Sequence, residues 1–210
     1  MEGREATPVT LLQLPRQVPG DAEIRPALRS SLLSSVAGDK DVAVFEELGI
    51  CRGQVRIDLA VVNGTLDGYE IKSDRDSLRR LGAQIELYSR VLDRATLVVG
   101  NRYLAGAAGM LPDWWGILRI EPTPGQPRFG VVRDGSPNPG LDPRALAELL
   151  WLEDALLLLD RCGGARGVKG KPRRLVWDRV AERCAVEEIG EAVRTSLKAR
   201  AARRAPPPRS

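Results

Sequence analysis

The dipeptide Asn63-Gly64 lies between two strand-like segments, and it constrains the fold more than any other feature of the sequence. Asn-Gly flanked by apolar and β-branched residues is the strongest short-range signal for a β-hairpin. We expect the first strand over 55–62 and the second to end at 69–72. A three-residue loop pairs positions whose numbers sum to 128, which places Asp58 opposite Glu70. The Cβ atoms of such a pair lie about 5 Å apart.

Helical and strand periodicities flank this hairpin on both sides. A helix is expected over about 21–36, and a strand over 42–48 follows it. After the hairpin, apolar spacing predicts a long helix over about 73–93, and an apolar run at 95–100 reads as a buried strand. The expected order is therefore α-β-β-β-α-β, which belongs to the α/β class.

The rest of the chain predicts one further strand and a group of helices. A strand over 114–120 can join the sheet at its edge, and a short hairpin is expected around 129–132. Asp142-Pro143 begins a Leu-rich helix that ends near 160, and further helices are expected at 175–184 and 187–200. We divide the chain into a flexible leader (1–20), a core (21–141), a basic helical extension (142–200) and a disordered tail (201–210).

The chain contains no histidine, and this absence restricts its chemistry. It excludes Ser-His-Asp and Cys-His nucleophiles, zinc sites that use histidine, and a histidine general base. The cysteines Cys51, Cys162 and Cys184 form no CxxC pair, so we expect reduced thiols in a cytoplasmic protein. No apolar stretch is long enough to span a bilayer, and no membrane partner is expected.

Positive charge is concentrated at the C-terminal end. Residues 161–210 contain 14 Lys or Arg and 5 Asp or Glu, a local charge of +9. Residues 1–160 contain 18 Lys or Arg and 23 Asp or Glu, a charge of −5. A basic third beside an acidic body suggests a polyanionic partner, and we expect DNA. The alternative is a solvated basic tail with no fixed partner. The expected nucleic-acid-binding residues are Arg173, Arg174, Arg179 and Arg183.

Three charged side chains of the hairpin are expected on one face of the sheet. Two carboxylates opposite one another repel unless a cation lies between them, and Asp58 and Glu70 form such a pair. With the carbonyl oxygen of Ile71 they make an all-oxygen site suited to Mg²⁺ or Mn²⁺. Lys72 shares the face of Glu70 and can orient a water or stabilise charge on a phosphate. The alternative is a solvated strand face with alternating charges.

The pattern Asp58, eleven intervening residues and Glu70-Ile71-Lys72 resembles the D…(D/E)xK signature of the PD-(D/E)XK nucleases, the restriction-endonuclease-like superfamily. Gln84 and Tyr88 on the next helix resemble the Q-x-x-x-Y motif of its RecB-like and Cas4-like branch. The stretch 46–100 looks most like an uncharacterised bacterial and phage-borne branch. Residue 57 is Ile where the signature has Pro, a departure shared by many branches.

The resemblance covers about residues 20–120 and implies a mixed four-stranded sheet with the core order deduced above. It implies that Asp58 and Glu70 hold a metal and that Lys72 is the catalytic lysine. Gln84 and Tyr88 would approach the metal or the DNA, although Tyr88 can equally belong to the core. The superfamily often supplies another acid from earlier in the chain. Glu47 is the candidate, with Glu46 and Glu23 as rivals.

These observations predict a Mg²⁺- or Mn²⁺-dependent nuclease that cuts a phosphodiester bond in single- or double-stranded DNA. Two alternatives stay open at this point. One is a nucleic-acid-binding module of the same fold that does not cleave. The other is an accessory protein of a phage, mobile-element or defence system, in which the C-terminal helices contact a partner from a neighbouring gene or a second copy of the chain.

Overall fold

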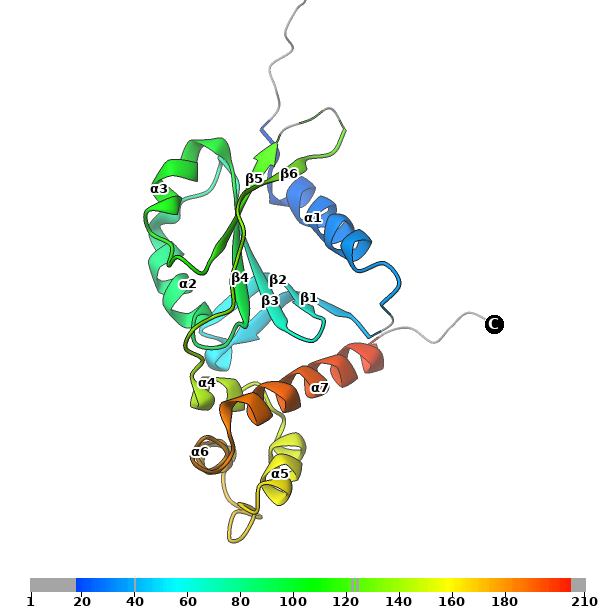
Figure 1. Ribbon diagram of the computed structural model, residues 1–210, viewed down its shortest axis with the longest axis vertical. Helices are drawn as coiled ribbons and strands as arrows, with labels where there is room; N and C mark the ends of the chain where they lie inside the picture. Colours follow the sequence, from blue (N-terminus) through cyan, green and yellow to red (C-terminus); the bar gives the residue numbers. More distant parts are fainter. Residues whose placement is uncertain (1–17, 40, 122, 124, 205–210) are drawn as a thin grey trace, which may run out of the picture.

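One six-stranded sheet lies at the centre of the computed structural model, which describes residues 18–39, 41–121, 123 and 125–204. The strands lie side by side in chain order, with helices on both faces of the sheet (Figure 1). The predicted α/β class is confirmed. The strands are β1 (Ala43–Ile50), β2 (Val55–Val62), β3 (Leu66–Lys72), β4 (Arg94–Val99), β5 (Gly116–Glu121) and β6 (Arg128–Arg133).

The helices divide into a group that covers the sheet and a group beyond one end of it (Figure 1). Helices α1, α2 and α3 flank the sheet, and α4 to α7 form the second group. Short 3-10 turns lie at Cys51–Gly53, Leu78–Arg80 and Asn101–Tyr103. The helices are α1 (Asp21–Ser35), α2 (Leu81–Tyr88), α3 (Leu104–Ala108), α4 (Pro143–Ala147), α5 (Leu152–Arg161), α6 (Arg173–Arg183) and α7 (Val186–Arg204).

The hairpin between β2 and β3 has the predicted register. The pairs run from Val62 with Leu66 to Leu59 with Tyr69, and each pair sums to 128. Gly64 has a φ of 72°, a left-handed conformation that glycine adopts without steric penalty. The ladder stops one residue before Asp58 and Glu70. Beyond this point the side chain of Asp58 replaces the backbone pairing: its carboxylate accepts a hydrogen bond from the N–H of Ile71 in β3.

The sheet is mixed, and it has six strands where four were expected. β1, β2 and β3 are antiparallel, β3, β4 and β5 are parallel, and β6 returns antiparallel to β5. The expected short hairpin around 129–132 is not formed; these residues belong to the single strand β6, which pairs with β5. The predicted strand over 114–120 is therefore an inner strand. Helix α2 makes the crossover between the parallel strands β3 and β4.

Separate apolar clusters cover the two faces of the sheet. Ile24 and Leu28 of α1 pack against Leu59 and Ile71 on one face. Tyr88 and the other apolar residues of α2 belong to the cluster on the opposite face. The Glu23 carboxylate accepts a 2.8 Å hydrogen bond from Gly20 N–H and closes the first turn of α1. Strands β2 and β3 are therefore covered from both sides.

Helix α2 is shorter than the predicted helix over 73–93. Ser73 does not begin a helix, because its N–H and Oγ–H both donate to Asp76, at 2.7 and 2.6 Å, and form a separate turn. At the other end, the side-chain amide of Asn138 donates to the carbonyls of Ser89 and Leu92, at 2.7 and 2.8 Å. These carbonyls are the ones that a continuing helix would use, so the helix ends near Tyr88.

The predicted Leu-rich helix is two helices, α4 and α5, with a break before Trp151. Trp151 has extended backbone angles, φ −68° and ψ 159°. The Leu150 carbonyl at the break accepts hydrogen bonds from Trp177 Nε1 (3.2 Å) and Arg173 Nη2 (3.1 Å) of α6. Contacts with α6 therefore satisfy the backbone at the break. Helix α7 extends into the predicted disordered tail, and residues 1–17 and 205–210 lie outside the described residues.

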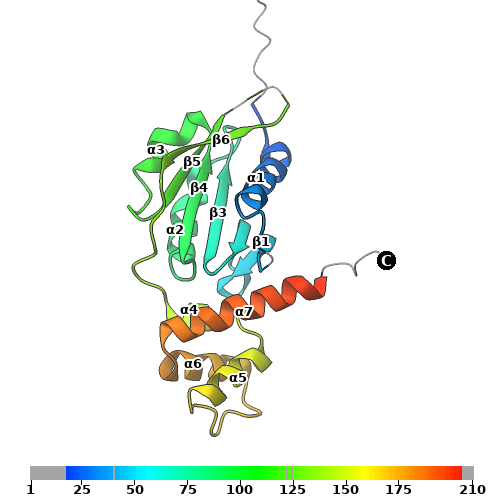
Figure 2. The same ribbon diagram turned by 45° about the vertical axis from the view of Figure 1, so that its right-hand side comes forward.

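Helix α7 joins the helical group to the sheet and passes the end of β1 in both views (Figures 1 and 2). Ile189, Val193 and Leu197 of α7 belong to the same buried cluster as Ala43 and Phe45 of β1. The helical extension therefore shares a core with the sheet. Of the described helices, none has the length and hydrophobicity to cross a membrane, and all three cysteines are free.

Candidate active site

The predicted site residues surround one cleft of about 560 Å³ between β2, β3, the start of α1 and α2. Its lining contains six of the predicted residues together with Arg25 and Asp21, which the sequence did not single out. Tyr88 is not among the lining residues. The structure thus gathers the expected side chains from four separate segments. The predicted residues in the lining are Glu47, Asp58, Glu70, Ile71, Lys72 and Gln84.

The inner cluster consists of Glu70, Lys72 and Gln84, which line the cleft, and of Tyr88, whose hydroxyl contacts Glu70. Glu70 is 2% exposed, and both of its oxygens accept hydrogen bonds. Oε1 accepts from Lys72 Nζ and Gln84 Nε2, each at 2.5 Å, and Oε2 lies 2.5 Å from the Tyr88 hydroxyl. Lys72 is itself only 7% exposed, so this is a buried ion pair. A buried charge needs such partners to be tolerated.

Tyr88 belongs to the buried core and also contacts the cleft residue Glu70. Its ring stacks on Trp115, with centroids 6.0 Å apart and planes 5° apart. Its hydroxyl also lies 2.7 Å from the Arg56 carbonyl, so one proton serves two acceptors. Burial, and then the negative charge of Glu70, raise the pKa of Tyr88 above its ordinary value. The phenol therefore stays protonated and acts as a hydrogen-bond donor to Glu70 rather than as a base.

The outer cluster consists of Asp21, Arg25, Glu47 and Asp58. Asp58 Oδ2 accepts a 2.8 Å hydrogen bond from Ile71 N–H, and Oδ1 accepts a 3.1 Å bond from Arg25 Nη2. Burial, and then the charge of Glu70, raise the pKa of Asp58 from 3.8 to about 6, against the opposing effects of Ile71 N–H, Arg25 and Lys72. The two clusters are therefore electrostatically linked through their carboxylates.

Arg25 is the main residue of the cleft that sequence reasoning missed. Its Nη1 donates to Glu47 Oε1 at 2.7 Å and to the Asp58 carbonyl at 3.0 Å. Its Nε and Nη2 donate to Asp21 at 3.1 and 3.2 Å. Burial lowers the pKa of Arg25, but the nearby carboxylates outweigh this effect and raise it. The available signal was an arginine on α1 between the core residues Ile24 and Leu28.

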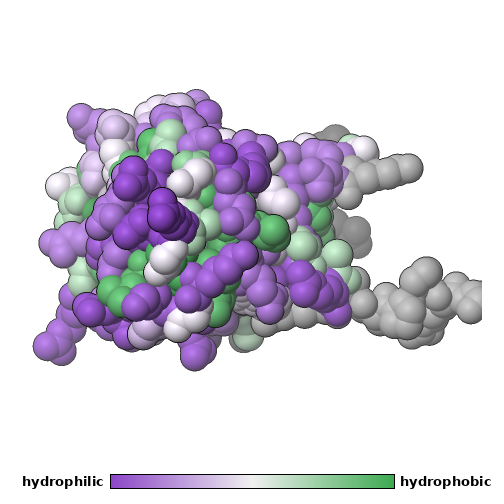
Figure 3. Space-filling model, turned by 90° about the horizontal axis from the view of Figure 1, so that it is seen from below, coloured by the Kyte–Doolittle hydropathy of each residue, from purple (hydrophilic) through white to green (hydrophobic). Residues whose placement is uncertain are grey.

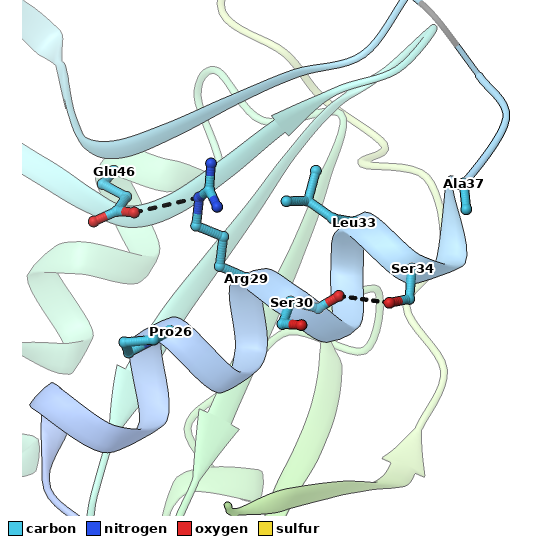
Figure 4. Close-up of a pocket in the computed structure, with 7 residues that line it drawn as sticks. All are labelled: Pro26, Arg29, Ser30, Leu33, Ser34, Ala37 and Glu46. Carbon is cyan, nitrogen blue, oxygen red and sulfur yellow. Dashed lines mark hydrogen bonds and ion pairs between the residues drawn. The ribbon is translucent and has the colours of Figure 1, made fainter.

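Of the three acids considered upstream, only Glu47 lines the cleft. Glu46 forms a 3.4 Å ion pair with Arg29 in a separate hollow beside α1 (Figure 4). Glu23 closes the first turn of α1, as described above. Glu47 has a φ of 53°, a left-handed conformation that is strained for a residue with a Cβ. It occupies the β1 position that would pair with Asp58 in the β1–β2 register.

The predicted three-acid metal set is not assembled. Within the described ranges, no three Asp, Glu, His or Cys side chains are grouped so as to hold a metal ion. The physical reason is Arg25, whose guanidinium bonds to both Glu47 and Asp58. The expectation that Glu47 joins Asp58 and Glu70 as a ligand is therefore wrong for this arrangement. For Ile71, the described contact is its N–H on Asp58.

The remaining donor set still fits a hard divalent cation. Asp58 and Glu70 offer carboxylate oxygens on one cleft, and the raised pKa of Asp58 reflects in part their mutual repulsion. Gln84 also lines the cleft, and its Oε1 is buried without a hydrogen-bond partner. Oxygen donors of this kind suit Mg²⁺ or Mn²⁺.

The four arginines predicted to bind nucleic acid lie on α6, in the helical extension. Arg173 lies over the Trp177 ring, 4.7 Å from its centroid, and Arg179 pairs with Glu182 at 3.5 Å. Arg183 packs beside Gly164, where a Cβ would fall 3.2 Å from the Arg183 Cβ. Arg174 is exposed. The structure thus places this group on a different element from the acidic cleft.

The fold and the cleft together define an α/β protein with a mixed sheet, an acidic cleft and a helical extension that shares its core. Residues 20–205 match the family of bacteriophage P4 protein cII, and the chain belongs to this family. A curated relative, protein cII of Enterobacteria phage P4, is 25% identical over 160 residues, which cover 76% of this chain. The chain spans 60% of the length of that relative.

A solved structure of a protein of unknown function from Silicibacter pomeroyi is also similar. It covers 77% of this chain and 98% of its own, with 19% sequence identity and a TM-score of 0.41.

Proposed function

We propose that the chain is a Mg²⁺- or Mn²⁺-dependent deoxyribonuclease of the PD-(D/E)XK type. One observation carries the proposal. Glu70 accepts hydrogen bonds from Lys72, Gln84 and Tyr88, and Glu70, Lys72 and Gln84 line the same cleft as Asp58. A solvated strand face would leave these side chains apart and exposed, whereas here Glu70 and Lys72 are buried together. Agreement between strand register, helix spacing and polar contacts is stronger support than any single motif.

The arrangement of the first elements also supports this type. The order α1, β1, β2, β3, α2, β4 is the one that the resemblance implies, with β3 and β4 parallel on either side of the α2 crossover. The strands β5 and β6 and the helices α4 to α7 would then be additions to that core.

Asp58 and Glu70 would hold the cation, with Gln84 Oε1 as a further oxygen donor. A bound divalent cation supplies Lewis-acid polarisation of the phosphate and lowers the pKa of a bound water. Lys72 would stabilise negative charge on the phosphate oxygens and orient the attacking water. Tyr88 would position Glu70 through its hydroxyl, since burial keeps the phenol protonated.

The loop between α5 and α6, together with its flanks, is the best place for a second contact with DNA. It forms the tip of the molecule farthest from the sheet in both ribbon views, and the surface seen from that end is largely hydrophilic (Figures 1, 2 and 3). Residues 161–174 contain no acidic residue. Clustered, exposed Lys and Arg side chains bind the phosphates of DNA without sequence preference. The exposed basic residues are Arg161, Arg166, Lys169, Lys171, Arg173 and Arg174.

The test of cleavage is an assay on linear, circular and single-stranded DNA with Mg²⁺ or Mn²⁺. Wild type should degrade at least one substrate, and Lys72→Met should lose activity by about 100-fold or more, because the lysine acts on the developing charge. Lys198→Met is the matched control, since Lys198 of α7 pairs with Asp41, which precedes β1, and lies outside the cleft. Equal activity of Lys72→Met and wild type would contradict the proposal.

The basic tip is tested separately by DNA-binding titrations at several salt concentrations. Replacing Arg166, Lys169 and Lys171 by Ala should weaken binding and reduce the salt slope by about 3, about one for each lost phosphate contact. Cleavage at saturating DNA should be kept. An unchanged salt slope would exclude the tip as a DNA contact.

A second candidate function is a DNA-binding module that keeps the fold but does not cleave. Arg25 favours it, because a guanidinium already neutralises Asp58 and Glu47 and no three-acid group is formed among the described residues. Such a protein should bind DNA with a steep salt dependence that Lys72→Met leaves unchanged, and it should show no cleavage with either cation.

A further inference from the structure

Arg25 is completely engaged by the outer cluster. Each of its five N–H groups has an acceptor: two on Asp21, one on Glu47 and two on Asp58, counting the Asp58 carbonyl. The side chain is 16% exposed. An arginine that satisfies all of its donors is a well-defined counter-ion rather than a loose surface charge.

The charges of the cleft do not balance, even with Arg25 in place. Its lining contains five acids and four basic side chains: Asp21, Glu47, Asp58, Glu70 and Asp76 against Arg25, Arg56, Lys72 and Arg80. With all of these side chains ionised, the lining carries a net charge of −1. A cleft with this charge and oxygen donors favours a divalent cation.

Arg25 also lies between the two acids that would otherwise approach the same ion. Glu47 of β1 stands at the register position of Asp58 of β2, and the guanidinium bonds to both carboxylates. The left-handed backbone at Glu47 shows that this arrangement is held against local strain.

We propose that Arg25 and a divalent cation compete for Asp58 and Glu47, so that the arginine holds the cleft in a metal-free state and must release these acids when the cation binds. The inference rests on the proposed metal site. Asp21 gives the released guanidinium a place to remain, because it already accepts from Nε and Nη2 and is 50% exposed. Arg25 would thus set the cation concentration at which the site fills.

The full-length chain should be titrated with Mn²⁺ alone by calorimetry, comparing wild type with Arg25→Ala. Competition predicts that the substitution tightens Mn²⁺ binding about tenfold, because the cation no longer displaces a charge-assisted contact. Arg29→Ala is the matched control, since Arg29 lies one turn along α1 and pairs with Glu46 outside the cleft (Figure 4). It removes the same charge and should change affinity by less than about threefold.

Thermal unfolding gives a second measurement that does not depend on cleavage. Without metal, Arg25→Ala should melt below wild type, because it leaves the carboxylates of Asp21, Glu47 and Asp58 without their shared partner. With excess Mn²⁺ it should gain more in Tm than wild type, since tighter binding to the native state stabilises more. Arg25→Gln keeps part of the side-chain volume and should show the same pattern if Arg25→Ala does not fold.

The outcomes separate the two proposals. Weaker or unchanged Mn²⁺ binding in Arg25→Ala and Arg25→Gln, with binding retained by wild type, would overturn the competition and leave the metal site intact. Absence of Mn²⁺ binding in wild type and in both variants would overturn the proposed metal site, and the competition with it.

Discussion

The inner and outer clusters of the cleft hold their carboxylates in contrasting ways. In the inner cluster, Glu70 is almost sealed and accepts from three side chains that lie on β3 and α2. In the outer cluster, Asp58 is half-buried and is held by one backbone N–H and by Arg25, a long side chain that reaches it from α1. One carboxylate is built into the packing, and the other depends on a side chain that reaches it from a different element.

Under the proposed competition, one cleft would combine a carboxylate with fixed partners and a carboxylate that exchanges its partner. Removing a partner from a buried ion pair leaves an uncompensated charge, whereas a partly exposed group can be solvated again by water. We therefore expect the inner cluster to govern the stability of the fold and the outer cluster to govern its response to pH and cations.

The largest effect is expected for Glu70→Ala. The substitution leaves the buried Lys72 ammonium without a counter-charge and should lower the free energy of unfolding by about 3–5 kcal/mol. Urea denaturation measures the loss. The double variant Glu70→Ala with Lys72→Met should recover part of it, because no buried charge remains. A loss below about 1 kcal/mol for Glu70→Ala would remove the proposed difference between the clusters.

Asp58→Asn should reveal the pH response of the outer cluster. The folded pKa of Asp58, about 6, lies above its ordinary value of 3.8, so between these values the native state binds more protons than the unfolded state. Wild type should therefore lose stability as pH rises through this window, by at most about 3 kcal/mol, and the variant should not. Urea denaturation from pH 3.5 to 7.5 in a chelator measures the difference. A constant difference would contradict the prediction.

Tyr88→Phe tests the hydroxyl of the inner cluster without disturbing the ring that stacks on Trp115. The variant loses the hydroxyl proton shared by Glu70 and the Arg56 carbonyl, which should lower the free energy of unfolding by about 1–2 kcal/mol. Tyr103→Phe is the control, because its hydroxyl donates to the Asp76 carbonyl at 2.7 Å in an exposed position and should matter less. Equal losses in thermal unfolding would show that the inner hydroxyl has no special role.

The smallest change is expected for Glu47→Gly. Glycine relieves the left-handed backbone at this position, while the variant loses an ion pair with Arg25 in which Glu47 is 47% exposed. The two effects oppose one another and should leave stability within about 1 kcal/mol of wild type. Denaturant unfolding measures it. A loss as large as that of Glu70→Ala would place Glu47 among the fixed groups.

Local signals in the sequence were sufficient for the hairpin and for most of the cleft. The Asn63-Gly64 turn determines the register, and strand alternation then places Glu70 and Lys72 on one face. Helical spacing places Gln84 and Tyr88 one turn apart beneath them. These relations depend on residues close together in the chain, so a single sequence suffices to predict them.

The parts that could not be predicted depend on contacts between distant segments. Arg25 reaches Asp58 across 33 positions of the chain. Asn138, which ends helix α2 by donating to the Ser89 carbonyl, lies 49 positions after Ser89 in the chain. The break before Trp151 is stabilised by Trp177 of α6. No local periodicity contains this information, because each contact forms only when the sheet and the helices have come together.

The shared core has a mechanical consequence. Because α7 buries its apolar side chains against β1, the helices cannot separate from the sheet without exposing Phe45 and its neighbours to water. The helical extension and the sheet are therefore expected to unfold in one cooperative transition. A force applied at the basic tip would be transmitted through α7 to β1, the strand that carries Glu47. The helical extension and the sheet would therefore move together under load.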